Sequence, residues 1–254
     1  MADVIIEAFQ KAIELILSGD PEVFSVVLRS LYVSGLGTLL ACAWSIPLAV
    51  IIGLYSFRGK WVIKGLFNGL IGVPTVALGL LLALLLSRQG VFGVFGLLYT
   101  ANGILIGQSI LITPIIITFT TSALENADVQ VKDLARTLGA NSFQTNVAVL
   151  RETVWSTILA VTAAFNRAFG ELGIALMVGG NILGLTRVLT SSIALNTTKG
   201  QYPEAMAFAI ILMIIVVTVT MLIRIVEKIR SEETSWSSIR DKFNDRLIFW
   251  RDRK

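Results

Sequence analysis

The amino-acid sequence predicts an all-α integral membrane protein with about five transmembrane helices. Of its 254 residues, 55% are hydrophobic and only 15% are charged, whereas about a quarter of a typical soluble domain is charged. No Asp, Glu, Lys or Arg occurs in residues 30–57, 65–87, 89–124 or 205–223. Because a helix needs roughly 20 apolar residues to cross a ~30 Å hydrocarbon core, each of these runs can span a membrane.

The predicted spans follow from these runs and from the breaks between them. We expect five, at about residues 26–55, 63–87, 103–123, 153–180 and 204–226. Residues 88–102 carry three glycines and lead into an Ala-Asn-Gly sequence at 101–103, and are expected to connect the second span to the third. The fourth span is interrupted by Arg167 and Glu171. Together these segments predict one membrane domain over residues 23–226.

The two ends of the chain are predicted to lie outside the hydrocarbon core. Residues 1–22 include an amphipathic helical pattern with Ile5, Phe9 and Ile13 on one face. Such a pattern is typical of a helix on the membrane surface, here the external one, rather than of a span or a signal peptide. Residues 227–254 mix basic and acidic side chains and are expected to form a solvated cytoplasmic tail.

The distribution of basic residues predicts the orientation. Residues 56–64, 125–152 and 224–254 hold three, three and nine Lys or Arg, which is fifteen on one side. On the other side, residues 1–29, 88–102 and 180–203 together hold five. Since basic residues accumulate in cytoplasmic loops, the N-terminus is expected outside and the C-terminus in the cytoplasm. The net charge of +4 then reflects topology, so no nucleic-acid partner is expected.

Several function classes are disfavoured by what the sequence lacks. It has no histidine and a single cysteine, Cys42, so neither a metal site nor a histidine-based catalytic site is expected. It also lacks the G-x-x-x-x-G-K-[ST] phosphate loop. The chain is therefore predicted to bind no cofactor, to be no enzyme, and to depend on a partner for energy.

The polar loop at residues 125–152 is too regular for a flexible linker. Val131, Leu134, Ala135 and Leu138 share one helical face, and Gly139 follows them. A second helical stripe begins after Gly139, which predicts a helix, a glycine turn and another helix. From the residues alone, this segment either packs on its own subunit or presents a surface to a partner.

The loop resembles the EAA motif of type I ABC importer permeases. Asp133 stands for the Glu, Ala135 for the second Ala, and Gly139 for the Gly of that motif. Leu134 and Ala140 complete the matched turn, whereas the end of the pattern departs, since Arg-Glu replaces the usual Leu-Pro. The resemblance implies that Asp133, Leu134, Ala135, Gly139 and Ala140 form the coupling helix, which docks on a separate ATPase subunit.

The resemblance covers about residues 24–226, and parts of it indicate which anion is transported. Residues 71–80 are similar to the second span of molybdate, sulfate and tungstate permeases. Residues 165–182 look most like the tungstate-type branch. The family implies a homodimer in a prokaryotic inner membrane, with two ATP-binding cassette subunits that hold the ATP and an extracytoplasmic oxyanion-binding protein. Molybdate or sulfate is the alternative cargo, and an ATP-independent channel or membrane enzyme is the alternative class.

The candidate pathway residues are polar or interrupt a span. Arg167 and Glu171 stand four apart, so they face one side of a helix and can pair. Since an ionisable residue in a span needs a partner, protein or water around it, the pair either locks the helix to a neighbour or lines an oxyanion pathway. The full candidate set is Pro74, Thr75, Asn166, Arg167, Glu171 and Asn181.

Overall fold

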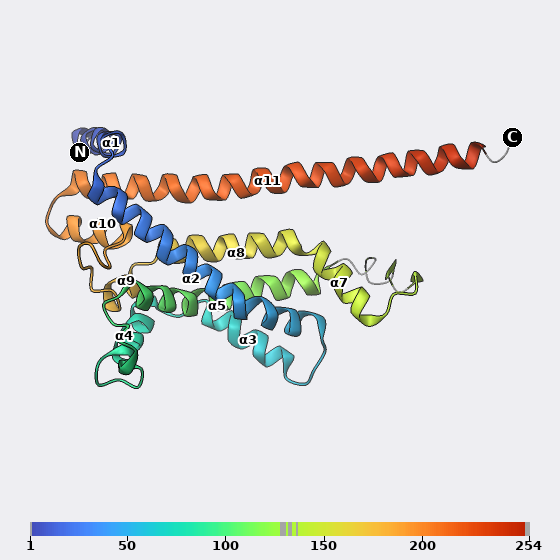
Figure 1. Ribbon diagram of the computed structural model, residues 1–254, viewed down its shortest axis with the longest axis horizontal. Helices are drawn as coiled ribbons and strands as arrows, with labels where there is room; N and C mark the ends of the chain where they lie inside the picture. Colours follow the sequence, from blue (N-terminus) through green and yellow to red (C-terminus); the bar gives the residue numbers. More distant parts are fainter. Residues whose placement is uncertain (1, 128–130, 132–133, 136, 252–254) are drawn as a thin grey trace. The chain divides into compact units, whose positions relative to one another are not determined.

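The computed structural model describes residues 2–127, 131, 134–135 and 137–251, and within these ranges the chain is helical with no strand (Figure 1). The predicted all-α class is therefore confirmed. The helices are α1 (Ala2–Leu17), α2 (Pro21–Leu54), α3 (Lys60–Leu70), α4 (Thr75–Leu86), α5 (Ala101–Glu125), α7 (Ser142–Glu152), α8 (Val154–Phe169), α9 (Gly173–Met177), α10 (Leu189–Thr198) and α11 (Tyr202–Arg251), with a short 3₁₀ turn η1 at Gly93–Phe95.

Three helices are long and apolar enough to cross a membrane by themselves. They are α2, α5 and the part of α11 over Tyr202–Val226. Two bent helix pairs bring the total to as many as five, with α3 and α4 meeting at 97° and α7 and α8 at 54°. The described part of the chain thus agrees with the predicted number of spans when each bent pair is counted as one.

The second predicted span differs from the structure, because residues 63–87 do not form one helix. The chain leaves α3 at Leu70 and starts α4 at Thr75, with Pro74 as N-cap at φ −62° and ψ 118°. Proline has no N–H to donate and disfavours helical geometry at the residue before it, here Val73. The sequence Gly-Val-Pro at residues 72–74 therefore accounts for the break between α3 and α4.

The fourth predicted span, at 153–180, is also broken. α8 ends at Phe169, and the five-residue α9 begins at Gly173 after a turn. In that turn, the backbone N–H of Gly170 donates to the carbonyl of Asn166, and that of Glu171 to the carbonyl of Ala168. The Glu171 carboxylate then accepts from the N–H of Ile174 in α9, which competes with continuation of α8.

Residues 1–216 form one compact unit in which α2, α5 and α8 pack together. Figure 1 shows α4 and α9 near one end of α5, where they pack against each other, and α7 beyond the other end. The buried core is aliphatic and includes Val33, Ile104, Ile112, Ile116 and Ala164. The outward faces are also apolar, which suits a helix bundle surrounded by lipid rather than water.

The rest of the chain, from Val217, forms a second unit. In it α11 continues as helix to Arg251, so the predicted tail at 227–254 is helical as far as it is described. At the other end of the chain, α1 matches the amphipathic helix expected within residues 1–22. Ile5, Phe9, Ile13 and Leu17 are exposed along it.

Candidate translocation pathway and coupling surface

The Arg167–Glu171 ion pair is present at the end of α8. Arg167 Nη1 donates to Glu171 Oε2 at 2.7 Å. The two side chains differ in exposure, with 40% of Arg167 exposed but only 2% of Glu171. The carboxylate is therefore held inside the protein, while the arginine extends from it toward the surface of the subunit.

Several further hydrogen bonds fix the turn that carries Glu171. Its backbone carbonyl accepts from the Thr190 hydroxyl of α10 at 2.9 Å. One turn earlier, the Gln108 amide of α5 donates to the carbonyl of Ala168 at 2.9 Å and accepts from the Ser34 hydroxyl of α2. Buried polar groups need such partners, and here they tie α2, α5, α8 and α10 to one buried site.

Gly173 brings the start of α4 against this site. A Cβ on Gly173 would stand 2.9 Å from the backbone nitrogen of Val76, 3.0 Å from the Thr75 hydroxyl and 3.1 Å from the Glu171 carboxylate. Only a residue without a side chain permits this approach. Thr75, Arg167 and Glu171, three of the predicted pathway residues, are thus gathered at one place.

The other three predicted pathway residues lie around or away from this place. Pro74 is exposed and directly precedes Thr75 at the α3–α4 break. Asn166 is half-buried on α8, next to Arg167. Asn181 lies in the loop after α9 at φ +53°, where its side-chain oxygen accepts from Arg187 Nε at 3.3 Å. Asn181 therefore holds a loop and does not join the Arg167–Glu171 site.

The hydroxyl-rich segment after Asn181 is mostly used to satisfy backbone groups. The Thr186 hydroxyl donates to the carbonyl of Gly179 and accepts from the N–H of Ile182. The Ser191 side chain accepts from the N–H of Val188 at the start of α10. These bonds favour a structural role, which is how re-entrant backbone is satisfied within a membrane protein.

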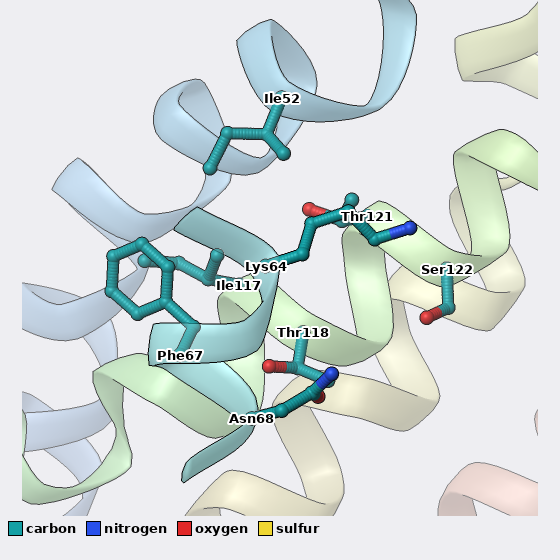
Figure 2. Close-up of a pocket in the computed structure, with 8 residues that line it drawn as sticks. All are labelled: Ile52, Lys64, Phe67, Asn68, Ile117, Thr118, Thr121 and Ser122. Atoms are coloured by element: carbon teal, nitrogen blue, oxygen red, sulfur yellow. The ribbon is translucent and has the colours of Figure 1, made fainter. Parts of the chain in front are cut away.

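A small cleft of mixed lining lies between α2, α3 and α5 (Figure 2). Its polar side chains are Lys64 and Asn68 from α3 and Thr118, Thr121 and Ser122 from α5. Beside it, Glu125 at the end of α5 pairs with both Lys60, at 2.9 Å, and Lys64. This two-to-one ion pair anchors α3 to α5 after the chain has turned at Tyr55–Gly59, and residue spacing alone gave no sign of it.

The glycine turn predicted at Gly139 is present. Gly139 has φ +80°, and the N–H of Ala140 donates to the carbonyl of Ala135 at 2.9 Å. This is the bond that closes a helix ending in a left-handed residue. Asn141 then caps α7 by a reciprocal pair of bonds with Gln144. The Asn-x-x-Gln spacing is a helix-start signal that would have located this cap from sequence.

Apolar side chains project into solvent around this turn. Leu134, Leu138 and Phe143 are 61%, 78% and 75% exposed. Leu134 and Leu138 belong to the apolar stripe of the first helix, which in a self-packed loop would be buried. Ala135, Gly139 and Ala140 are small residues between these three. Asp133, also predicted for this surface, lies outside the described residues. We call Leu134, Leu138 and Phe143 the turn surface.

Comparison with known proteins identifies the family. The family described as binding-protein-dependent transport system inner membrane component matches residues 45–228. The chain belongs to this family. The resemblance drawn from the loop motif is thereby confirmed, as is the type I ABC permease fold. The protein is a multi-pass inner-membrane permease, and its family works with ATPase and binding-protein partners.

Several curated relatives cover most of the chain. The tungstate uptake system permease protein TupB of Peptoclostridium acidaminophilum is 38% identical, over 84% of this chain and 93% of the relative. TupB of Campylobacter jejuni is 32% identical, over 84% and 89%. The molybdenum transport system permease protein ModB of Escherichia coli is 30% identical, over 76% and 87%.

Proposed function

We propose that this permease carries tungstate inward as part of an ATP-driven importer, working as a homodimer with two ATPase subunits and an extracytoplasmic oxyanion-binding protein. The observation that carries the coupling part of the proposal is the turn surface, which exposes three large apolar side chains around the left-handed turn at Gly139. Tungstate is favoured because two relatives named for tungstate uptake match over 84% of the chain. Molybdate or sulfate is the second candidate, supported by relatives named for those anions.

The orientation is part of the proposal. The turn surface and the Lys60–Lys64–Glu125 cluster belong to segments that are rich in basic residues, and such segments stay in the cytoplasm. The N-terminus, α1 and α10 are then external. In this orientation the turn surface faces the compartment that holds ATP, and the α10 end faces the binding protein.

The Arg167–Glu171 site is proposed to line the pathway. A single bundle of about five helices is too thin to enclose a route for an ion, which favours two copies around one path. Arg167 supplies positive charge to a passing dianion, and Glu171 moderates that charge so that the anion is released. ATP bound by the partner subunits closes them, the turn surfaces move with them, and the spans alternate between inward-facing and outward-facing arrangements.

Coupling is tested at the turn surface. Phe143→Asp removes an exposed apolar side chain and adds a charge, and Ser142→Asp adds the same charge one residue earlier, at the start of α7, where an acid is favourable. We expect Phe143→Asp to abolish uptake and co-purification of the ATPase, and Ser142→Asp to preserve both. Equal behaviour of the two variants, or full uptake by Phe143→Asp, would refute an apolar docking contact.

One experiment in proteoliposomes tests both which anion is transported and whether transport requires ATP. The reconstituted complex with its binding protein should show ATPase activity that tungstate stimulates more than molybdate or sulfate does. A preference for sulfate would overturn the metal-oxyanion proposal. Anion flux without ATP would instead support a channel.

A further inference from the structure

A charged, half-open cavity lies away from the Arg167–Glu171 site, where α1, the start of α2, α10 and the first turns of α11 meet. Its volume is about 240 Å³, below the roughly 300 Å³ at which drug-sized ligand sites begin, so it suits a small polar group. Six ionisable side chains line it, three of them basic and three acidic: Lys11, Arg187, Lys199, Asp20, Glu22 and Glu204.

One buried polar group in this cavity lacks a partner. Ser192 on α10 is 1% exposed and lines the cavity. Within the part of the chain that the structure describes, its hydroxyl has no hydrogen-bond partner. Leaving a buried hydroxyl unpaired is costly, so a ligand that reaches Ser192 would relieve that cost.

The balance of charge limits what the ligand is. Arg187 and Glu22 already approach each other at 3.6 Å, and Asp20 accepts from the first N–H groups of α2. Lys199 and Glu204, one at the end of α10 and the other at the start of α11, offer opposite charges at the cavity. A dianion would meet as many acids as bases there, and no cluster of metal-binding side chains occurs among the described residues. The cavity suits a group that carries both charges.

The apolar surroundings indicate how that group arrives. Val23, Leu195 and Phe208 complete the lining. The neighbouring outward faces of α2 and α11 are apolar, with Phe24 60% and Met213 57% exposed. These two helices are spans, so their outward faces meet acyl chains, and the charged cavity lies where the spans end.

We propose that this cavity binds the head group of a zwitterionic phospholipid that carries a primary ammonium. The phosphate lies toward Lys199 and Arg187, the ammonium toward Glu204, and the acyl chains extend along α2 and α11. A loop of a soluble protein would also supply both charges, but it would gain nothing from the apolar faces beside the cavity. The amphipathic α1, which contributes Lys11, lies at the same level and suits the membrane surface.

The test uses the purified full-length chain and three lipids with identical dioleoyl chains. Native mass spectrometry measures the binding of phosphatidylethanolamine, phosphatidylglycerol and phosphatidylcholine. Phosphatidylethanolamine should bind about tenfold more tightly than either of the others, since one charge-assisted hydrogen bond is at stake. Equal affinities for the three lipids, or no retained lipid, would overturn the proposal.

Two variants are expected to change lipid binding in different ways, one through the phosphate and the other through the ammonium. Lys199→Gln removes a partner of the phosphate, which all three lipids share, and should weaken the binding of all three about tenfold. Glu204→Gln removes the partner of the ammonium and should weaken phosphatidylethanolamine alone. Arg88→Gln, an exposed charge change on the segment before η1, is the matched control and should change neither. Loss of lipid selectivity in the control, or its retention in Glu204→Gln, would contradict the assignment.

A photo-crosslinking residue at position 199 in intact membranes distinguishes the competing occupant. Lipid adducts are expected. An adduct with a protein in place of lipid would overturn the proposal and make the cavity a protein-docking surface. None of these measurements depends on transport. A negative result for lipid binding therefore says nothing against the proposed cargo, and a negative result for the cargo says nothing against the lipid site.

Discussion

Arg167 and Glu171 form an ion pair of 2.7 Å in which the carboxylate is buried and the guanidinium is partly exposed. This asymmetry predicts unequal effects of removing either partner. Arg167→Gln leaves a buried carboxylate without its counter-charge and should lower the free energy of unfolding by about 3 kcal/mol. Glu171→Gln keeps an oxygen for the N–H of Ile174 and should cost about 1 kcal/mol.

Thermal unfolding of the two variants in one detergent checks this ordering, and Arg167→Lys is the control that retains the charge. Equal midpoints for Arg167→Gln and Glu171→Gln would show that burial of the carboxylate does not decide the energy. If the pair also lines the pathway, Arg167→Gln should reduce uptake more than Arg167→Lys does at matched protein levels.

Gly173→Ala is expected to separate α4 from α9. The added methyl would meet the backbone nitrogen of Val76 at 2.9 Å, and backbone cannot rotate away as a side chain can. We expect a loss of about 1–3 kcal/mol in the free energy of unfolding and reduced uptake, because Thr75 moves away from Glu171. Gly65→Ala on α3, where nothing lies within 4 Å, is the control. It should leave uptake unchanged and should not lower the free energy of unfolding, because alanine favours a helix interior by up to about 1 kcal/mol. Wild-type uptake by Gly173→Ala would remove the α4–α9 contact from the pathway.

Gly139→Val should uncouple ATP hydrolysis from transport. The space around Gly139 is open, so the substitution acts through its φ of +80°. A left-handed conformation costs a residue with a side chain about 1–2 kcal/mol. That is about tenfold in the population of the native turn. Gly139→Asn is the matched control, since asparagine tolerates this conformation better. Uptake and anion-stimulated ATPase activity should fall in the order glycine, asparagine, valine, and a different order would argue against a conformational cause.

Glu125→Gln should loosen α3 from α5. Both Lys60 and Lys64 lose their carboxylate partner, although Lys60 still donates to backbone carbonyls at the end of α2. We expect a decrease of about 1–2 kcal/mol in the free energy of unfolding. Because the three side chains are partly exposed, the decrease should shrink as salt concentration rises. Thermal unfolding at low and high ionic strength measures this, with Glu7→Gln on the exposed α1 as control. A salt-independent decrease would indicate packing rather than charge.

The sequence was most informative where one physical requirement dominated. Crossing a hydrocarbon core demands long uncharged runs, so α2, α5 and the first part of α11 were predicted close to their observed limits. Gly139 was predicted as a turn because a helical stripe stops there, and its positive φ agrees. The pair at Arg167 and Glu171 followed from helical spacing, and the fold keeps it even though α8 ends between the two residues.

Other features depended on contacts between distant residues. The carboxylate of Glu125 meets two lysines about sixty residues earlier, which only the packing of α3 on α5 reveals. The approach of Thr75 to Glu171 depends on Gly173 and on the direction of α4 after its bend. Pro74 was expected to interrupt the second span, but its sequence context did not show that the span divides into two helices at 97°. A local signal was available for one miss, since Asn141 with Gln144 marks the start of α7.

The bend of 97° between α3 and α4 has a consequence for how the protein enters the membrane. With 11 and 12 residues, the two halves reach only about 17 and 18 Å along their axes. Neither half alone crosses a bilayer during synthesis. The bent pair of short helices gains its contact with α5, through the Lys60–Lys64–Glu125 cluster, only after α5 has been made, and α4 gains its contact with α9 later still. The α3–α4 pair, the second apolar stretch of the chain, therefore depends on α5, the third, for its final position in the membrane.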